Sequence, residues 1–178
     1  MIDFKDNPEL QKFVDEVSAE NKISVKYIPV SITLLWGDNA KKHDIPQLIK
    51  SMQEYGFKDP PAFDKNLKAL VEGNGRAEAL TRMKEDGLNA PRGIIVDPNT
   101  KEWLMPVLFG VDANNESQAR RYALDHNNLV LAGGDFTAYD TSRMWDSEGY
   151  KALLESIKED GIAFSANDLN GASVIHNG

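Results

Sequence analysis

The sequence predicts an α+β fold, and three observations support this prediction. Segments with apolar residues at helical spacing are interspersed with segments rich in β-branched and aromatic residues. Two pairs of short strands are separated by turn residues, which indicates antiparallel hairpins. Hydrophobic residues make up 41% of the 178 positions, which is enough for one packed core. We therefore expect a small mixed sheet flanked by helices.

The helices are predicted from their capping residues and apolar stripes. Asn7 is expected to cap a first helix that begins at Pro8. Asp44 caps a second helix, and Gly56 marks its end. Further helices are predicted from residue 76 to Gly87, over residues 116–128 and over residues 147–160.

Strands are predicted between these helices. Residues 26–36 are expected to form one strand, with Pro29 keeping its start near an edge of the sheet. A first hairpin joins residues 60–64 to residues 69–72. A second hairpin spans residues 92–111, with its turn at residues 97–99.

The expected organisation is a core with additions at both ends. Residues 1–25 form an N-terminal helical extension, and residues 26–112 form the core. Residues 113–162 are a helical part that completes a cleft. Residues 163–178 are rich in Asn, Ser and Gly and are expected to be a flexible tail.

Composition excludes several classes of function. The chain has no cysteine, so disulfides, thiolate metal sites and cysteine-based catalysis are excluded. Its net charge of -8 opposes non-specific binding to nucleic acid, although residues 40–43 and 120–121 are compact basic groups. No apolar run has the length of a membrane helix, and residues 1–10 lack the layout of a signal peptide. We expect a cytoplasmic protein without a membrane partner.

The stretch "LVEGNGRAEAL", residues 70–80, combines a strand, two glycines, an arginine and the start of a helix. The first N–H groups of a helix lack intrahelical partners, and the helix dipole places partial positive charge there. Gly73 and Gly75 permit close approach of a ligand to the backbone. Arg76 adds a fork of donors that matches phosphate oxygens. The pattern predicts an anion seat at residues 73–76, most naturally for phosphate.

Two simpler interpretations stay open at this junction. The residues also suit a tight strand-to-helix turn in which Arg76 pairs with Glu72 or Glu78. Glu72 is either a surface carboxylate that caps the turn or a functional group beside the seat. In the functional case it acts as a base or holds Mg²⁺ through water.

Several boxes together resemble a known family. "DNAKKH", "IPQLIKSMQEYGFKDPP" and "LVEGNGRAEALTRM" are followed by "ARRYALDHNN" and "MWDSEGYKALLESIKEDG". In this order they resemble the N-terminal domain of ParB-like proteins, which share a fold with sulfiredoxin. The resemblance covers roughly residues 27–161 and is closest to members found in phages and mobile elements beside DNA methyltransferases.

This resemblance implies a ParB/sulfiredoxin-like fold that binds Mg²⁺ and a nucleoside triphosphate, CTP or ATP. The implied phosphate contacts are Gly73, Asn74, Gly75 and Arg76; Asn127 and Asn128 are implied for metal or phosphate; and Asn39, Lys41, Lys42 and His43 line the other side of the cleft.

The chain also departs from the family pattern. Partition proteins usually carry an acidic residue at the position of Asn74, and the glutamine and arginine of their later box are not visible in "DHNNLVL". The absence of cysteine removes the sulfiredoxin reaction. No helix-turn-helix is recognisable after the core.

Three functions are compatible with these residues. The first is a nucleotide-binding domain linked to the DNA metabolism of a phage or mobile element, acting on DNA through a basic patch or a protein partner and able to form a homodimer. The second is an NTP hydrolase or nuclease in which Glu72 is the base or metal carboxylate and Arg76 stabilises developing charge. The third is a non-catalytic interaction protein with a degenerate site.

Overall fold

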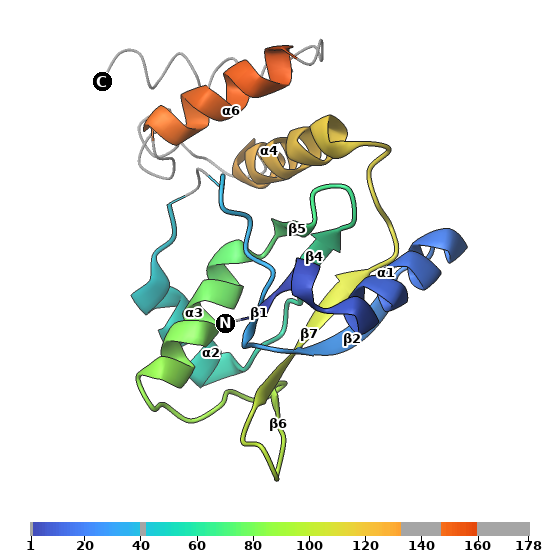
Figure 1. Cartoon of the computed structure of the whole chain (residues 1–178). Coiled ribbons are helices and arrows are strands. Elements are labelled where there is room, and N and C mark those ends of the chain that lie inside the picture. Colours follow the sequence, from blue (N-terminus) through green and yellow to red (C-terminus); the bar gives the residue numbers. More distant parts are fainter. Residues whose placement is uncertain (1, 40–41, 133–146, 160–178) are drawn as a thin grey trace. The chain divides into compact units, whose positions relative to one another are not determined.

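The computed structural model describes residues 2–39, 42–132 and 147–159. Helices are mixed with strands along the chain, and the largest sheet among the described residues has five strands (Figure 1). This confirms the predicted α+β class. The chain divides into two compact units. The first contains residues 1–36 and 44–113, and the second contains residues 37–43 and 114–178.

The first unit holds the sheet and three α-helices. A short 3-10 helix, η1, precedes the first of them. In chain order its elements are β1 (Ile2–Asp3), η1 (Phe4–Asp6), α1 (Pro8–Glu20), β2 (Ser24–Pro29), β3 (Ile32–Thr33), α2 (Ile45–Tyr55), β4 (Ala62–Asp64), β5 (Ala69–Glu72), α3 (Asn74–Glu85), β6 (Ile95–Val96) and β7 (Trp103–Phe109).

The predicted helix starts are confirmed for α1 and α2. The Asn7 side chain accepts a hydrogen bond from the Leu10 amide at 3.0 Å, and Pro8 occupies the first helical position. The Asp44 carboxylate accepts one from the Gln47 amide at 3.1 Å. Each bond satisfies an amide that the helix itself leaves without a partner.

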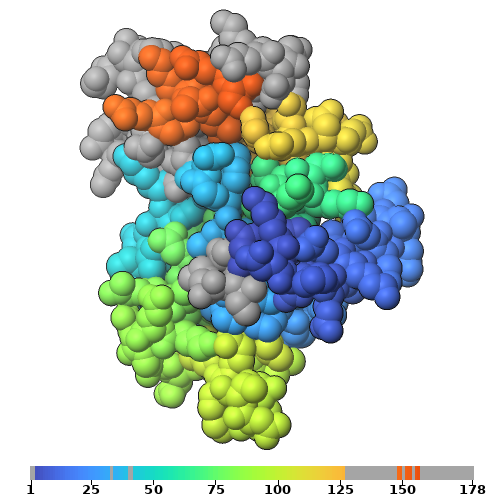
Figure 2. All heavy atoms as spheres, in the orientation of Figure 1, coloured from blue at the N-terminus to red at the C-terminus, as the bar shows by residue number. Residues whose placement is uncertain are grey.

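The main sheet is mixed and is organised around β7. Its strand order is β2-β7-β4-β5, and β6 pairs with β7 as well. β2 and β6 run antiparallel to β7, whereas β4 runs parallel to it. β4 and β5 form the first predicted hairpin, and β6 and β7 form the second. Figure 2 shows the turn of this second hairpin projecting from the rest of the first unit.

The single strand predicted over residues 26–36 is wrong in its extent. β2 ends at Pro29, and the chain turns at Val30 and Ser31. The next residues form β3, which pairs in parallel with β1 in a separate two-stranded sheet. The Val30 amide donates to Trp103 O at 2.8 Å. Because the N–H groups of an antiparallel strand alternate in direction, the backbone nitrogen of Pro29 faces away from β7. An edge strand tolerates proline there because no ladder hydrogen bond is lost.

One face of β7 forms the centre of the core. Its alternate residues, including Val107 and Phe109, are buried. The Phe109 ring lies 5.3 Å from the ring of Phe63 on β4, and it meets Phe13 of α1 edge-on at 5.5 Å. Met105 lines the same small pocket as Ala77 of α3. Both α1 and α3 therefore pack against this face.

A buried carboxylate organises the β4–β5 turn. Asp64 is 4% exposed, and its side chain accepts hydrogen bonds from the amides of Asn66 at 2.8 Å, Leu67 at 3.1 Å and Ala113 at 2.7 Å. The turn is thereby joined to the chain that leaves β7. Burial raises the pKa of Asp64 above its ordinary value of 3.8, although the three N–H donors act in the opposite direction.

The second unit contains two described helices, α4 (Glu116–Ala132) and α6 (Ser147–Glu159), which lie against each other. Arg120 of α4 donates a hydrogen bond to the Ser156 hydroxyl of α6 at 2.6 Å. Both helices are confirmed, and α4 runs beyond its predicted end at residue 128. The predicted tail, residues 163–178, lies outside the described residues.

Among the described residues, we found no helix with the length and apolar character needed to span a membrane.

The raised pKa of Asp64 predicts the sign of a pH effect on stability. As pH rises through the window between the ordinary pKa and the raised one, the unfolded chain loses its proton first, so ionisation favours unfolding. We expect the free energy of unfolding of the wild type, relative to Asp64→Asn, to fall across this window and to be constant above it. Urea denaturation of both proteins between about pH 3 and pH 7 checks this. A relative stability that rises over the same window contradicts it.

Candidate anion site at the β5–α3 junction

Gly73 joins β5 to α3 in a conformation that requires glycine. Its backbone is left-handed, with φ of 83° and ψ of 12°. A Cβ at this position would lie 2.6 Å from Cβ of Pro61 and 3.0 Å from Nη2 of Arg76. Pro61 is buried and held in place, because its carbonyl accepts a hydrogen bond from the Leu108 amide of β7 at 2.9 Å. Both the backbone angle and the close approach therefore exclude a side chain here.

The start of α3 differs from the starts of α1 and α2. In the described part of the chain no side chain caps it, since Gly73 occupies the capping position. The Ala77 amide donates to Gly73 O at 3.0 Å, but the amides of residues 74–76 precede the first helical hydrogen bond. The positive end of the helix dipole lies at these amides. This geometry favours an anionic acceptor.

Arg76 lies beside the same turn. Its Nη2 would lie 3.0 Å from a Cβ built on residue 73, so the guanidinium is folded back over Gly73. Its Nη1 lies 3.0 Å from Oδ2 of Asp59. Its Nε is buried and forms no hydrogen bond with the described residues. The Arg76 side chain is 28% exposed, so part of it remains accessible to solvent.

Asn74 has a structural role that its sequence position did not reveal. Its side chain is buried, with 7% exposure of the residue. Oδ1 accepts a hydrogen bond from the Trp36 amide at 2.9 Å, and Nδ2 donates one to Leu70 O at 3.0 Å. Asn74 thus holds the segment that ends at Trp36 against the β5–α3 junction through one acceptor and one donor.

This pair of bonds explains why the position is an amide and not an acid. A carboxylate accepts hydrogen bonds only, so it would satisfy the Trp36 amide but face the Leu70 carbonyl with a second acceptor. It would also bring a charge into a buried place.

Glu72 is the last residue of β5 and is half-buried. Its Cα is paired with that of Ala62 on β4. It directly precedes Gly73 in the chain. Gly75 is buried in the first turn of α3.

The structure brings residues 72–76 together with Asp59 and Pro61 in the first unit. The other predicted site residues belong to the second unit. Asn39 Nδ2 lies 3.5 Å from His43 Nε2, and Lys42 is exposed. Lys41 lies outside the described residues. Asn127 and Asn128 lie in α4, with side chains outside the described part of the structure.

Within the described ranges, no group of three or more His, Asp or Glu side chains is arranged to hold a metal ion.

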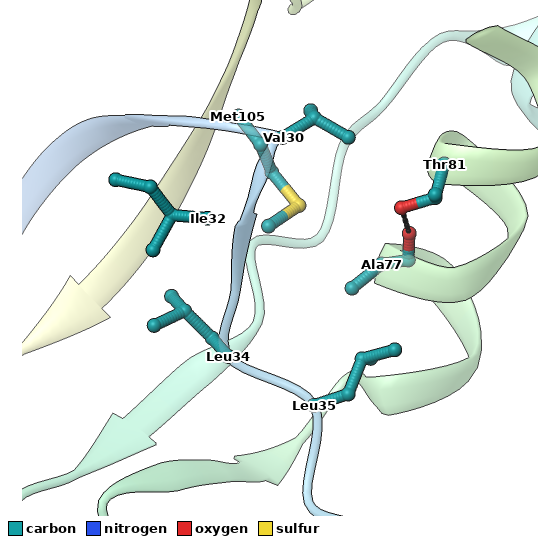
Figure 3. Close-up of a pocket in the computed structure, with 7 residues that line it drawn as sticks. All are labelled: Val30, Ile32, Leu34, Leu35, Ala77, Thr81 and Met105. Atoms are coloured by element: carbon teal, nitrogen blue, oxygen red, sulfur yellow. Dashed lines mark hydrogen bonds between the residues drawn. The ribbon is translucent and has the colours of Figure 1, made fainter. Parts of the chain in front are cut away.

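A small pocket lies on the inner side of α3 and is separate in chemistry from the junction. Its volume is about 20 Å³, which suffices for about one water molecule. Figure 3 shows Ala77 and Thr81 of α3 on one side of it and Val30 and Met105 on the other. Thr81 supplies its one polar side chain, and that hydroxyl donates to Ala77 O at 3.0 Å. The pocket is a packing defect without a charged group. Its lining residues are Val30, Ile32, Leu34, Leu35, Ala77, Thr81 and Met105.

Asp59 and Pro61 are the site residues that sequence reasoning missed. The run "KDPP" indicates a stiff entry to β4, because proline restricts its own backbone and that of the residue before it. Nothing in that run indicates that it lies beside residues 73–76. The proximity arises because β4 and β5 are paired.

Comparisons of the chain with protein-family models, with curated proteins and with solved structures gave no match.

The two bonds of Asn74 predict that Asn74→Asp destabilises the fold. We expect a loss on the order of 3 kcal/mol, because a buried charge is introduced and a donor to Leu70 O is removed. Denaturant unfolding at neutral pH measures it. Asn89→Asp, the same change at an exposed position, is the matched control and should have little effect. Equal stability of the two variants would show that the two hydrogen bonds of the Asn74 side chain do not stabilise the fold.

Proposed function

We propose that the first unit binds the phosphate groups of a nucleotide at the β5–α3 junction, as a ParB-like domain. The observation that carries the proposal is the position of the Arg76 guanidinium, folded over the glycine that begins α3. Backbone amides and a guanidinium are the two donor types that recognise phosphate oxygens, and here they lie at one helix start.

The order of boxes along the sequence supports the same proposal. The strand, the "GNGR" turn and the following helix occur where ParB-like proteins hold the triphosphate. The left-handed conformation of Gly73 gives the first glycine of this box a physical role. The tight contact with Pro61 gives it a second one.

Mg²⁺ with CTP or ATP is the ligand that this proposal implies. Phosphate oxygens and carboxylates are the ligands that Mg²⁺ prefers, and Glu72 is the carboxylate next to the seat. For Asn127 and Asn128, and for residues 39 and 41–43, a role in ligand binding is implied by the resemblance alone. A link to DNA, through a protein partner or a basic patch, and a second copy of the chain as partner belong to the same proposal.

Substitution of Arg76 tests the proposal. We expect Arg76→Ala to weaken binding of Mg²⁺–CTP or Mg²⁺–ATP by about 2 kcal/mol, roughly thirtyfold, because a charged donor to phosphate is lost. Isothermal titration calorimetry of wild type and variant with each of the four ribonucleoside triphosphates measures this.

Arg82→Ala is the matched control for this experiment. Arg82 lies on the same helix, is 61% exposed and forms an ion pair with Asp86 at 3.0 Å. Its removal changes the net charge equally but leaves the junction intact, so binding should be unchanged. No binding by the wild type, or equal binding by Arg76→Ala, would end the proposal.

A second function, phosphoryl transfer or phosphodiester cleavage, is favoured by one specific observation. Glu72 is half-buried at the end of β5 and directly precedes the seat. In this second function the carboxylate would hold a metal ion or accept a proton from an attacking water. Arg76 would stabilise the charge that develops on the phosphate in the transition state.

This second function predicts activity that depends on Glu72. Phosphate release from a nucleoside triphosphate, or nicking of plasmid DNA, should fall by about 10²-fold or more in Glu72→Gln, because the base or metal carboxylate is lost. Glu78→Gln, an exposed position on α3, controls for the loss of one charge. Activity that persists in Glu72→Gln excludes this role for the residue.

A further inference from the structure

We propose that Asp59 is a built-in competing anion for the phosphate seat, and that its carboxylate must leave Arg76 before a ligand phosphate takes its place. This inference rests on the proposed function and adds a regulatory contact to it. It is carried by the Asp59–Arg76 ion pair, by the exposure of its two partners and by the stiffness of the segment that presents the carboxylate.

The ion pair occupies the donor that a phosphate needs. Oδ2 of Asp59 lies 3.0 Å from Nη1 of Arg76, while Nη2 of the same guanidinium packs against Gly73. A bidentate phosphate contact uses two nitrogens of the guanidinium. Nε is buried, so Nη1 is the group at which the carboxylate and an incoming oxygen compete.

The backbone that carries Asp59 is held in place. Pro60 and Pro61 follow it directly, so its own backbone is restricted to extended conformations. Pro61 is buried, contacts Gly73 and accepts the hydrogen bond from the Leu108 amide. Release of Arg76 therefore requires rotation of one short side chain and no movement of the segment.

The exposure of the two partners makes the contact displaceable. The Asp59 side chain is 74% exposed, whereas that of Arg76 is 28% exposed. A released carboxylate would therefore be hydrated at once, and an ion pair with one exposed partner is weak. Because the carboxylate is attached to the chain, it competes with every anion that approaches Nη1 of Arg76. A phosphate with two negative charges and additional contacts to the helix amides displaces it.

Removal of this carboxylate should tighten phosphate binding. We expect Asp59→Asn to bind inorganic tripolyphosphate about threefold more tightly than the wild type, the size of an exposed ion pair converted to an affinity ratio. The gain should be the same for Mg²⁺–CTP, because both ligands compete for the same nitrogen. Calorimetry at constant ionic strength measures both.

The chain offers a closely matched control. Asp86 forms an ion pair of the same length, 3.0 Å, with Arg82 on the same helix, and both partners are exposed. Asp86→Asn changes the net charge by the same amount at the far end of α3, so its affinity should equal that of the wild type. In the double variant Asp59→Asn/Arg76→Ala the gain should disappear, because no guanidinium remains to be released.

The outcomes separate this inference from the proposed function. If binding depends on Arg76 but Asp59→Asn is no tighter than Asp86→Asn, the competing-anion role is overturned and the phosphate seat stands. If Asp59→Asn and Asp86→Asn gain affinity equally, the gain comes from the change in net charge, and the competing-anion role is likewise overturned. If no variant binds tripolyphosphate or CTP, both the seat and the competing anion are overturned.

Discussion

The close contact between Gly73 and Pro61 is the constraint on which the candidate site depends. A Cβ at residue 73 would lie 2.6 Å from the proline ring, so only glycine fits where β5 leads into α3. The contact brings the segment before β4 against the first turn of α3. Arg76 then lies over the glycine, and Asp59 lies within reach of its guanidinium. One backbone contact thus brings together the Arg76 guanidinium, the Asp59 carboxylate and the start of α3.

The side chain of Asn74 secures this arrangement from the inner side. Its two hydrogen bonds reach Trp36 and Leu70, and the Leu70 amide donates in turn to Leu34 O at 2.7 Å. The segment that leads to Trp36 therefore runs beside the junction and is bonded to it at two points. The Asn74 side chain is thus bonded to the protein chain, whereas its backbone amide lies at the start of α3. The donors that remain for a ligand are the backbone amides and Arg76.

Much of the fold was predictable because its signals are local. The caps at Asn7 and Asp44 and the hairpin turn at Asp97 act over a few residues, and the structure contains each of them. The extent of the strand after residue 26 was not predictable, because residues 32–33 pair with β1, which lies far from them in the sequence. The same reason applies to the site. The glycines and Arg76 are visible in one short motif, whereas the contacts of Asp59 and Asn74 exist only once β4, β5 and residues 34–36 are assembled.

The central claim is that an anion binds at the amides that begin α3. Its most direct test is an ¹H–¹⁵N NMR titration of the uniformly labelled chain with inorganic tripolyphosphate at constant ionic strength. The account predicts that the largest shift changes fall on the backbone amides of residues 73–76, and that they saturate together. The account would be contradicted if the signals of these groups did not shift, or if the shift changes fell mainly on exposed lysines and did not saturate.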